Sequence, residues 1–216
     1  MSAGGRDPLR IAVPKGRVLS GLARLFARAG IDCGDLLADD RRLVRDSGDG
    51  RLRFYLLKPD DVPTWVEYGA ADLGVSGRDV LMERRYRLYQ LVELGIGRCR
   101  LVVATRKGAV VPDAPRIATK YRELAAAHFG ARGIQAEIVY VQGSVELAPL
   151  TGLADAIVDL VETGTTLVEN DLEERETIAE ISSVLVANPA LYKLRLAEAR
   201  GVVERLRAAV ESAGEA

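Results

Sequence analysis

Residues 155–166 read DAIVDLVETGTT, and this stretch has the pattern of a buried strand that ends in a turn. A mostly apolar run reaches Val161, an acidic residue follows it, and a cluster of threonines around one glycine comes next. Short apolar runs bounded by turn residues are typical of buried strands, and a threonine cluster indicates a helix start. A strand that passes so directly into a helix is typical of an α/β chain.

The same alternation continues on both sides of this stretch. Strand-like runs cover residues 9–13, 52–57, 71–75, 88–94, 99–105, 116–119, 138–141 and 177–186. Helical spacing of apolar residues covers 19–29, 62–66, 121–129 and 190–212. A hairpin is expected around residues 47–50. Strands that alternate with helices predict an α/β chain with mostly parallel sheets. No linker is rich in Pro or Ser, which favours two lobes joined by short crossovers.

Composition excludes several classes of protein. The chain has 216 residues, of which 48% are hydrophobic and 28% charged, a globular rather than a disordered composition. Its formal net charge of -1 is unlike that of a dedicated nucleic-acid binder. No apolar run approaches the roughly 18 residues that indicate a membrane span, and residues 1–8 do not read as a signal peptide. We therefore expect a cytoplasmic protein with no nucleic-acid or membrane partner.

The rare residues narrow the chemistry further. The single histidine, His128, excludes a histidine-based metal cluster and gives little support to a Ser-His-Asp triad. Cys33 and Cys99 lack CxxC spacing and are interpreted as buried thiols of a reducing compartment. Trp65 and Tyr68 are expected to pack a helix, and His128 is expected near a helix end as a surface or cap residue.

The stretch at 155–166 has the parts of a site for a ribose 5-phosphate. Ligands of open α/β sheets bind at the carboxyl ends of strands, and helix N-termini offer unpaired N–H groups to phosphate. Gly164 permits close approach to the backbone, and the flanking threonines add hydroxyl donors. An acidic residue before the loop can accept the ribose hydroxyls. The alternative is a plain helix cap formed by the threonines.

Three further junctions repeat the strand–glycine–helix pattern. They are Pro14–Arg17, Gly74–Asp79 and Gly143–Glu146. The first is not a nucleotide-binding P-loop, since GxxxxGK[ST] does not occur, and by itself it could be a solvated basic turn. Four such junctions in one α/β chain indicate a cleft lined by loops and helix starts, suited to an anionic ligand between two lobes.

These residues carry a family resemblance. The stretches IAVPKGR (11–17), DVPTWVEYGAADLGVSGRDVL (61–81), RIATKY (116–121) and GSVELAPLTGLADAIVDLVETGTTLVEN (143–170) are similar to those of the ATP phosphoribosyltransferases that open histidine biosynthesis. The resemblance runs from Leu9 to about Arg207, and the length matches the short form of that family, without a C-terminal allosteric domain.

The resemblance implies a fold and a reaction. The fold is a two-lobed α/β fold like a type II periplasmic binding protein, with the chain crossing twice between lobes. We place one lobe at residues 1–94 plus 181–216 and the other, with the phosphoribosyl pyrophosphate (PRPP) loop, at 95–180. The reaction condenses ATP with PRPP to give N1-(5-phosphoribosyl)-ATP and pyrophosphate, with Mg²⁺ bound with the substrate. The metal ligands are not identified.

By resemblance, the loop after 159 holds PRPP, and the basic residues of the other lobe stabilise the leaving pyrophosphate. Lys58 is a departure, because relatives often carry Arg there, and Lys cannot make a bidentate contact. The expected catalytic residues are Lys15, Arg17, Arg41 and Lys58. The expected PRPP-binding residues are Asp159, Glu162, Thr163, Gly164, Thr165 and Thr166. The expected ATP-binding residues are Gly16, Gly77, Asp79, Ser144 and Glu146.

The family's short form also implies partners: a second copy of the chain and a regulatory subunit similar to histidyl-tRNA synthetase, which supplies histidine feedback. Three alternatives remain open. One is a non-catalytic binding protein of the same fold, another is a phosphoribosyltransferase for a different base, and the third is a structural subunit with a degenerate site.

Overall fold

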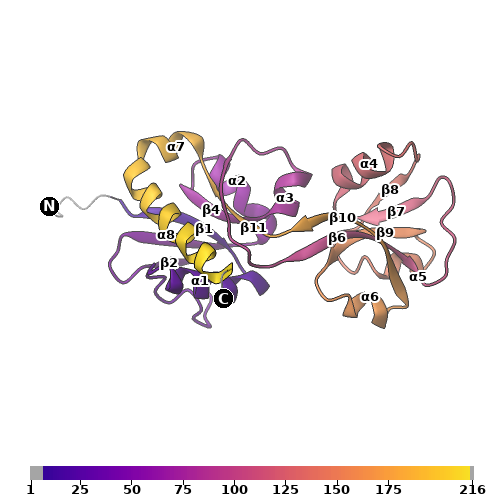
Figure 1. Cartoon of the computed structure of the whole chain (residues 1–216), viewed down its shortest axis with the longest axis horizontal. Coiled ribbons are helices and arrows are strands. Elements are labelled where there is room, and N and C mark those ends of the chain that lie inside the picture. The colour runs from indigo at the N-terminus through magenta and orange to yellow at the C-terminus, as the bar shows by residue number, and fades with distance from the viewer. Residues whose placement is uncertain (1–6, 215–216) are drawn as a thin grey trace. The chain divides into compact units, whose positions relative to one another are not determined.

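The structure is a computed structural model that describes residues 7–214, and the chain divides into two compact units. Unit 1 holds residues up to 81, then 85–97, and those from 182 onward; unit 2 holds 82–84 and 98–181. The expected lobe limits at 94/95 and 180/181 fall close to these positions. That the second lobe carries the PRPP loop stays a prediction. Figure 1 follows the elements along the chain.

Unit 1 is built on a six-stranded sheet in the order β2-β3-β1-β4-β11-β5. Its strands are β1 (Leu9–Pro14), β2 (Val44–Asp46), β3 (Leu52–Leu57), β4 (Leu73–Gly77), β5 (Tyr89–Glu93) and β11 (Ser183–Ala187). β1 runs parallel to β3 and β4, while β2, β11 and β5 pair antiparallel with their neighbours. The expected hairpin is confirmed as β2–β3.

Helices cover both faces of this sheet. They are α1 (Arg17–Arg28), the short η1 (Pro59–Asp61), α2 (Val62–Glu67), α3 (Arg78–Glu83), α7 (Pro189–Leu194) and α8 (Leu196–Gly214). One core joins β1, β3 and β4 to α1 and α8 through residues such as Phe26, Phe54 and Leu206. A smaller core on the opposite face joins α2 to β1 and β11. Asn188 caps α7 as expected, since its side-chain oxygen accepts from the N–H of Ala190 at 3.0 Å.

Unit 2 has a five-stranded sheet in the order β10-β6-β9-β7-β8. Its elements are β6 (Cys99–Arg106), β7 (Arg116–Thr119), α4 (Arg122–Gly130), β8 (Glu137–Tyr140), α5 (Leu147–Leu150), β9 (Ala156–Val161), α6 (Thr165–Glu169) and β10 (Leu172–Ile181). β9, β7 and β8 are parallel neighbours, whereas β6 and β10 run antiparallel. The core on one face contains Phe129 of α4, and the core on the other contains Leu167 of α6.

The expectation of mostly parallel sheets is wrong, because both sheets are mixed. Residues 177–186 are also not one strand. β10 ends at Ile181 and β11 begins at Ser183, in different sheets. Both runs favour extended structure, so the local pattern does not reveal that one residue separates two sheets.

Tyr68 and His128 differ from their sequence interpretation, whereas Trp65 packs against a ring as expected. Tyr68 is 83% exposed and therefore does not pack its helix, while Trp65 lies 6.0 Å from the Tyr55 ring and is partly exposed. The side chain of His128 is only 8% exposed, and its Nε2 lies 2.8 Å from Glu176 Oε1. Arg132 also pairs with Glu176, so the histidine is part of a polar cluster rather than a surface cap.

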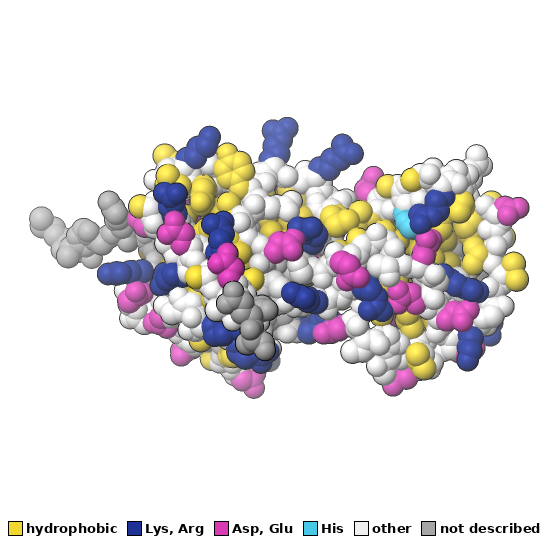
Figure 2. All heavy atoms as spheres, viewed as in Figure 1, with side chains coloured by type: hydrophobic (Ala, Val, Ile, Leu, Met, Phe, Trp, Pro, Cys, Tyr) yellow, Lys and Arg dark blue, Asp and Glu magenta, His cyan; other side chains and the backbone are white. Residues whose placement is uncertain are grey.

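The visible surface mixes both signs of charge. In Figure 2 dark-blue cationic and magenta anionic side chains alternate over the face shown, and the cyan histidine lies next to both. Between residues 7 and 214 no helix combines the length and apolar character needed to cross a membrane. Cys99 is buried as expected, whereas Cys33 is only half-buried.

Candidate functional site

The carboxyl ends of three parallel strands meet at one edge of the sheet of unit 1. Pro14 at the end of β1 pairs with Leu57 at the end of β3, and Lys15 N donates to Leu57 O at 2.8 Å. Lys15 and Lys58 therefore follow paired positions and leave the sheet side by side. The β1–β4 register brings the end of β4, at Gly77, to the same edge. Ligands of α/β proteins bind at such edges.

The turn after β1 opens toward the start of α1. Gly16 has φ +88° and ψ −145°, a conformation that a side chain would strain. No side chain caps α1, and its first turn has no acidic residue. The N–H groups of the first turn of this 12-residue helix have no side-chain cap, and an uncapped helix start is a place where anions bind in proteins.

Lys15 and Arg41 line one pocket of about 360 Å³ in unit 1. The side chains of Lys15, Arg41 and Lys58 are exposed and make no hydrogen bond or ion pair with any other described residue. Three exposed cations without a side-chain partner near one edge indicate a place for an anionic ligand. The sequence interpretation of these residues stays a prediction that this geometry supports.

Gly77 and Asp79 form the tight turn between β4 and α3. Asp79 is buried, and a Cβ added at Gly77 would lie 2.2 Å from Asp79 Oδ1. The carboxylate is thus folded against the backbone of the turn, and a side chain at Gly77 would displace it. This gives both residues a structural role, and their contact with ATP stays a prediction.

A second edge, in unit 2, collects the loops that follow β9, β7 and β8. Thr119 pairs with Tyr140, so the turns after β7 and β8 leave the sheet together. Along β9 the side chains alternate, and Asp159 shares a face with Ile157 and Val161. That face packs against α5 and α6. Asp159 therefore lies on the face of the sheet that α6 covers, and the threonine loop leads into α6. The predicted contact of Asp159 with the ribose needs this placement.

The threonine loop itself is compact. Gly164 has φ +82°, and it precedes the first residue of α6. Thr163 Oγ1 and Thr165 Oγ1 lie 3.0 Å apart, and Glu162 and the threonines of the loop are exposed. The helix start is confirmed, but α6 has only five residues. Anion binding here stays a prediction, and it would depend on N–H and hydroxyl groups more than on a long helix dipole.

Sequence reasoning missed two basic residues near this loop. Arg100 and Lys107 line a pocket of about 390 Å³ together with Thr163 and Gly164. Arg100 pairs in register with Val161 and forms an ion pair with Glu174 at 2.8 Å. This hydrogen bond lowers the pKa of Glu174. The β6–β9 register places Arg100, and the hydrogen bond from Lys107 N to Asp171 O places Lys107; no local pattern contains either of these pairings.

Ser144 and Glu146 belong to the turn after β8. Ser144 is exposed with φ +50°, and its carbonyl accepts from Leu147 N at 3.1 Å. Glu146 is half-buried directly before the single turn of α5. The turn lies at the same sheet edge as the threonine loop, and the assignment of both residues to ATP stays a prediction.

The described residues do not form a metal cage. Within 7–214, no three His, Cys, Asp or Glu side chains gather closely enough to hold a metal ion. Mg²⁺ usually keeps several waters and binds substrate phosphates with one or two carboxylates. The residues present fit a magnesium ion that arrives on a substrate diphosphate, and they do not fit one held by protein ligands alone.

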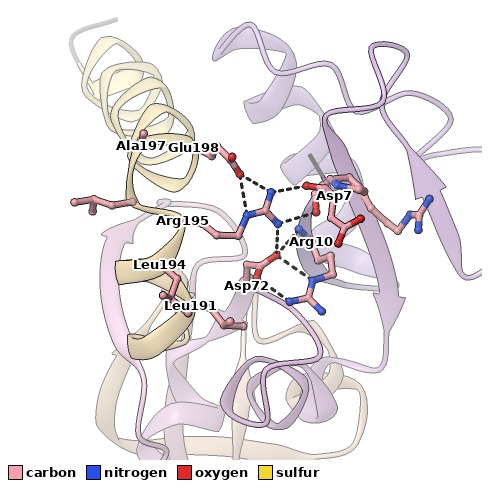
Figure 3. Close-up of a pocket in the computed structure, with 11 residues that line it drawn as sticks. Asp7, Arg10, Asp72, Leu191, Leu194, Arg195, Ala197 and Glu198 are labelled. Carbon is pink, nitrogen blue, oxygen red and sulfur yellow. Dashed lines mark hydrogen bonds and ion pairs between the residues drawn. The ribbon is translucent and has the colours of Figure 1, made fainter. Parts of the chain in front are cut away.

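A larger pocket, of about 790 Å³, lies at the opposite edge of the sheet of unit 1. Figure 3 shows how Arg10, Asp72 and Arg195 converge there. Asp72 is almost fully buried and accepts from Arg10 Nη2 at 2.9 Å and from Arg195 Nη1 at 3.2 Å. Arg195 also donates to the carbonyl of Pro8 at 2.9 Å. Because these cations already have partners, this pocket is not the candidate site.

A family model described as ATP phosphoribosyltransferase matches residues 58–208. The chain belongs to the ATP phosphoribosyltransferase family. A relative described by that name from Sorangium cellulosum is 61% identical, over 96% of this chain and 98% of its own length. A second ATP phosphoribosyltransferase, from Geobacillus kaustophilus, is 48% identical over 94% of this chain and 98% of its own length. The family expected from the sequence motifs is confirmed.

Solved structures agree with this membership. The chain is similar to one in the ATP phosphoribosyl transferase (HisG:HisZ) complex from Thermotoga maritima, with a TM-score of 0.81, 34% identity and coverage of 94% and 99%. It also matches the periplasmic aliphatic sulphonate binding protein SsuA from Escherichia coli, with a TM-score of 0.61 at 14% identity, over 95% of this chain and 73% of that one. The second likeness shows the fold alone. The two-lobed fold class expected for an ATP phosphoribosyltransferase is confirmed.

Proposed function

We propose that this chain condenses ATP with PRPP to give N1-(5-phosphoribosyl)-ATP and pyrophosphate, the first step of histidine biosynthesis. The observation that carries this function is 61% identity, over nearly the full length of both chains, to an ATP phosphoribosyltransferase. This identity favours the transferase over the alternatives of a pure binding protein and a degenerate subunit.

The reaction needs charge stabilisation more than proton transfer. The C1–O bond of the ribose breaks, the adenine N1 lone pair forms the new C1–N bond, and pyrophosphate leaves with the bonding electrons. Adenine N1 carries no proton to remove, so no general base is required. Catalysis then consists of positioning and of stabilising the negative charge that develops on pyrophosphate. The chain has only one histidine, and the candidate site has exposed lysines at the carboxyl ends of its strands. Both features suit a reaction that needs charge stabilisation and no general base.

Each unit has its own part in the proposed mechanism. In unit 1, Lys15, Arg17, Arg41 and Lys58 stabilise the leaving pyrophosphate, and Gly16 permits contact with the first N–H groups of α1. In unit 2, the loop 162–166 holds the 5-phosphate of PRPP and Asp159 accepts the ribose hydroxyls. ATP contacts the turns that contain Gly77 and Asp79, and Ser144 and Glu146.

Mg²⁺ bound with PRPP supplies positive charge on the diphosphate and so weakens the bond to be broken. The protein's role toward it is to bind the remaining diphosphate oxygens through Lys15 and Arg41. A metal carried by the substrate is consistent with the absence of a three-ligand cluster within residues 7–214.

The proposed partners are a second copy of the chain and a regulatory subunit similar to histidyl-tRNA synthetase. Support comes from the Thermotoga maritima relative, whose structure is a HisG:HisZ complex. Because ATP and PRPP are cytoplasmic metabolites, the chain is proposed to act in the cytoplasm. Histidine alone is expected to inhibit the isolated chain poorly, since feedback would require the partner.

The function is tested by mass-spectrometric detection of phosphoribosyl-ATP from purified protein with ATP, PRPP, Mg²⁺ and pyrophosphatase. Product that needs ATP, PRPP and Mg²⁺ together supports the proposal. Free adenine, GTP and hypoxanthine replace ATP in parallel reactions, and preference for one of them would indicate a different acceptor base. The reactions are repeated with the regulatory subunit. No phosphoribosyl-ATP in either form overturns the function.

A further inference from the structure

Arg45 occupies the single inward-facing position of the short edge strand β2. The strand has an exposed–buried–exposed pattern, and Arg45 lies opposite the fully buried Phe54 of β3. The side chain of Arg45 is only 2% exposed, although strand alternation places an apolar residue at such a position. Burying a guanidinium costs stability unless it is well paired, so its presence here needs a reason.

The partner of Arg45 is Asp40, in the segment 38–43 that leads into β2. Arg45 Nη1 donates to Asp40 Oδ2 at 3.0 Å, and Nη2 donates to Oδ1 at 2.5 Å. The two groups form a bidentate ion pair, the strongest geometry for these side chains. The hydrogen bond from Arg45 lowers the pKa of Asp40 and raises that of Arg45. The pair therefore ties the segment 38–43 to the sheet.

The same carboxylate also holds the residue that follows Arg41. Arg42 N donates to Asp40 Oδ1 at 2.7 Å, and Arg42 Nε donates to Oδ2 at 2.9 Å. Arg41 thus lies between two residues fixed by one carboxylate, while its own side chain has no partner among the described residues. It lines the pocket that Lys15 also lines. The arrangement holds the backbone of Arg41 and leaves its charge for a ligand.

Stability alone does not explain Arg45. Its Nε is buried with no hydrogen-bond partner, and an unsatisfied buried donor costs stability. Methionine has a similar length and fills buried positions without that cost. What a methionine would lose is the tie between β2 and Asp40, and through it the fixed position of Arg41.

We propose that Arg45 and Asp40 are positioning residues for the transferase reaction: their ion pair fixes the segment 38–43 and so holds Arg41 beside Lys15 for the leaving pyrophosphate. This inference rests on the proposed function. Arg45 also lines the pocket, but its side chain is only 2% exposed and both of its Nη atoms donate to Asp40, so we infer that it acts through Arg41 rather than on the substrate.

The test compares Arg45→Met with Arg53→Met. Arg53 lies on the next strand and forms a similar bidentate pair, with Asp46 at 2.7 and 3.0 Å, but does not bond to the segment 38–43. Arg45→Met is expected to lower kcat roughly tenfold or more, since small misplacements of catalytic groups have effects of this size. Its melting temperature is expected to stay equal or rise. Arg53→Met is expected to keep the wild-type kcat.

A double-mutant cycle separates positioning from a general structural role. If Arg45 acts through Arg41, the double variant Arg41→Ala with Arg45→Met is no slower than Arg41→Ala alone. Equal losses in both backgrounds would overturn the inference, as would a wild-type kcat in Arg45→Met. If Arg45→Met fails to fold, Asp40→Asn replaces it, because that residue is partly exposed and Asn retains one acceptor. If the wild-type protein forms no phosphoribosyl-ATP, the proposed function is refuted. If the wild type is active and Arg45→Met and Asp40→Asn have the same kcat, only the inference about Arg45 is refuted.

Discussion

The two edges of the sheet of unit 1 use cations in opposite ways. At the amino edge, Arg10 and Arg195 converge on the buried carboxylate of Asp72. At the carboxyl edge, Lys15 and Lys58 leave paired strand ends with no side-chain partner among the described residues. The ion-paired arginines stabilise the fold, whereas the exposed lysines have no partner and can bind an anionic ligand. Pocket size alone would favour the amino edge over the candidate site, since the amino-edge pocket is the larger.

The largest expected effect is on stability, at the amino edge. Asp72→Ala removes the acceptor of two arginines and of the Arg10 backbone N–H, which donates to Asp72 at 2.8 Å. Breaking such a buried pair costs about 3 kcal/mol of unfolding free energy. Urea denaturation measures this loss, and kcat at low temperature is expected to be unchanged. If Asp72→Ala instead lowers kcat strongly and leaves stability intact, the amino edge is not purely structural, and the contrast between the two edges is refuted.

The next effect is on turnover, at the carboxyl edge. Lys58→Ala is expected to lower kcat about 100-fold through loss of charge stabilisation of pyrophosphate, with a smaller change in ATP affinity and no change in melting temperature. Steady-state kinetics with varied ATP and PRPP measure both parameters. Lys58→Arg serves as the charge-preserving control. Weaker ATP binding with normal turnover would place Lys58 on the substrate instead.

A third prediction concerns Gly164 in the threonine loop of unit 2. Gly164→Val forces a branched side chain into a left-handed conformation at φ +82°, next to the proposed 5-phosphate site. We expect the Kd for PRPP to rise about tenfold, with a stability loss of about 1–2 kcal/mol. Gly133, at φ +71° in an exposed turn, is the matched control. Gly133→Val should lose similar stability and keep PRPP affinity, as measured by calorimetry; equal loss of affinity in both would contradict the site.

The smallest effect concerns an exposed pair near the amino edge. The hydrogen bond from Arg53 lowers the pKa of Asp46 below its ordinary value of 3.8. The carboxylate therefore contributes stability above that pH and loses it as the pH falls through the lower, folded-state pKa. Because the pair is about half exposed, its contribution is about 0.5 kcal/mol or less.

Urea denaturation of Asp46→Asn at neutral pH and at about pH 2 tests this. The difference from wild type should be small at neutral pH and vanish in acid, where the wild-type carboxyl is protonated too. A difference that grows in acid would reverse the sign of the linkage and refute the assignment.

Local patterns were sufficient where the signal is short-range. The apolar spacing of α1, the turn before α6 and the cap at Asn188 all depend on neighbours within a few residues, and the structure agrees with each. Tyr68, His128 and the junction at Ser182 were misread because their environment comes from distant segments. Glu176, the partner of His128, is 48 residues away in the sequence.

The sequence by itself determined the family and the α/β class and supplied the candidate site residues, because motifs and apolar periodicity are properties of contiguous residues. Only the tertiary structure decided which cations are paired. Arg10 lies in β1 and Lys15 directly follows that strand, yet the Arg10 side chain pairs with Asp72 whereas the Lys15 side chain has no hydrogen-bond or ion-pair partner among the described residues. Strand register and the packing of segments remote in sequence set those partners, and neither is encoded in any local pattern.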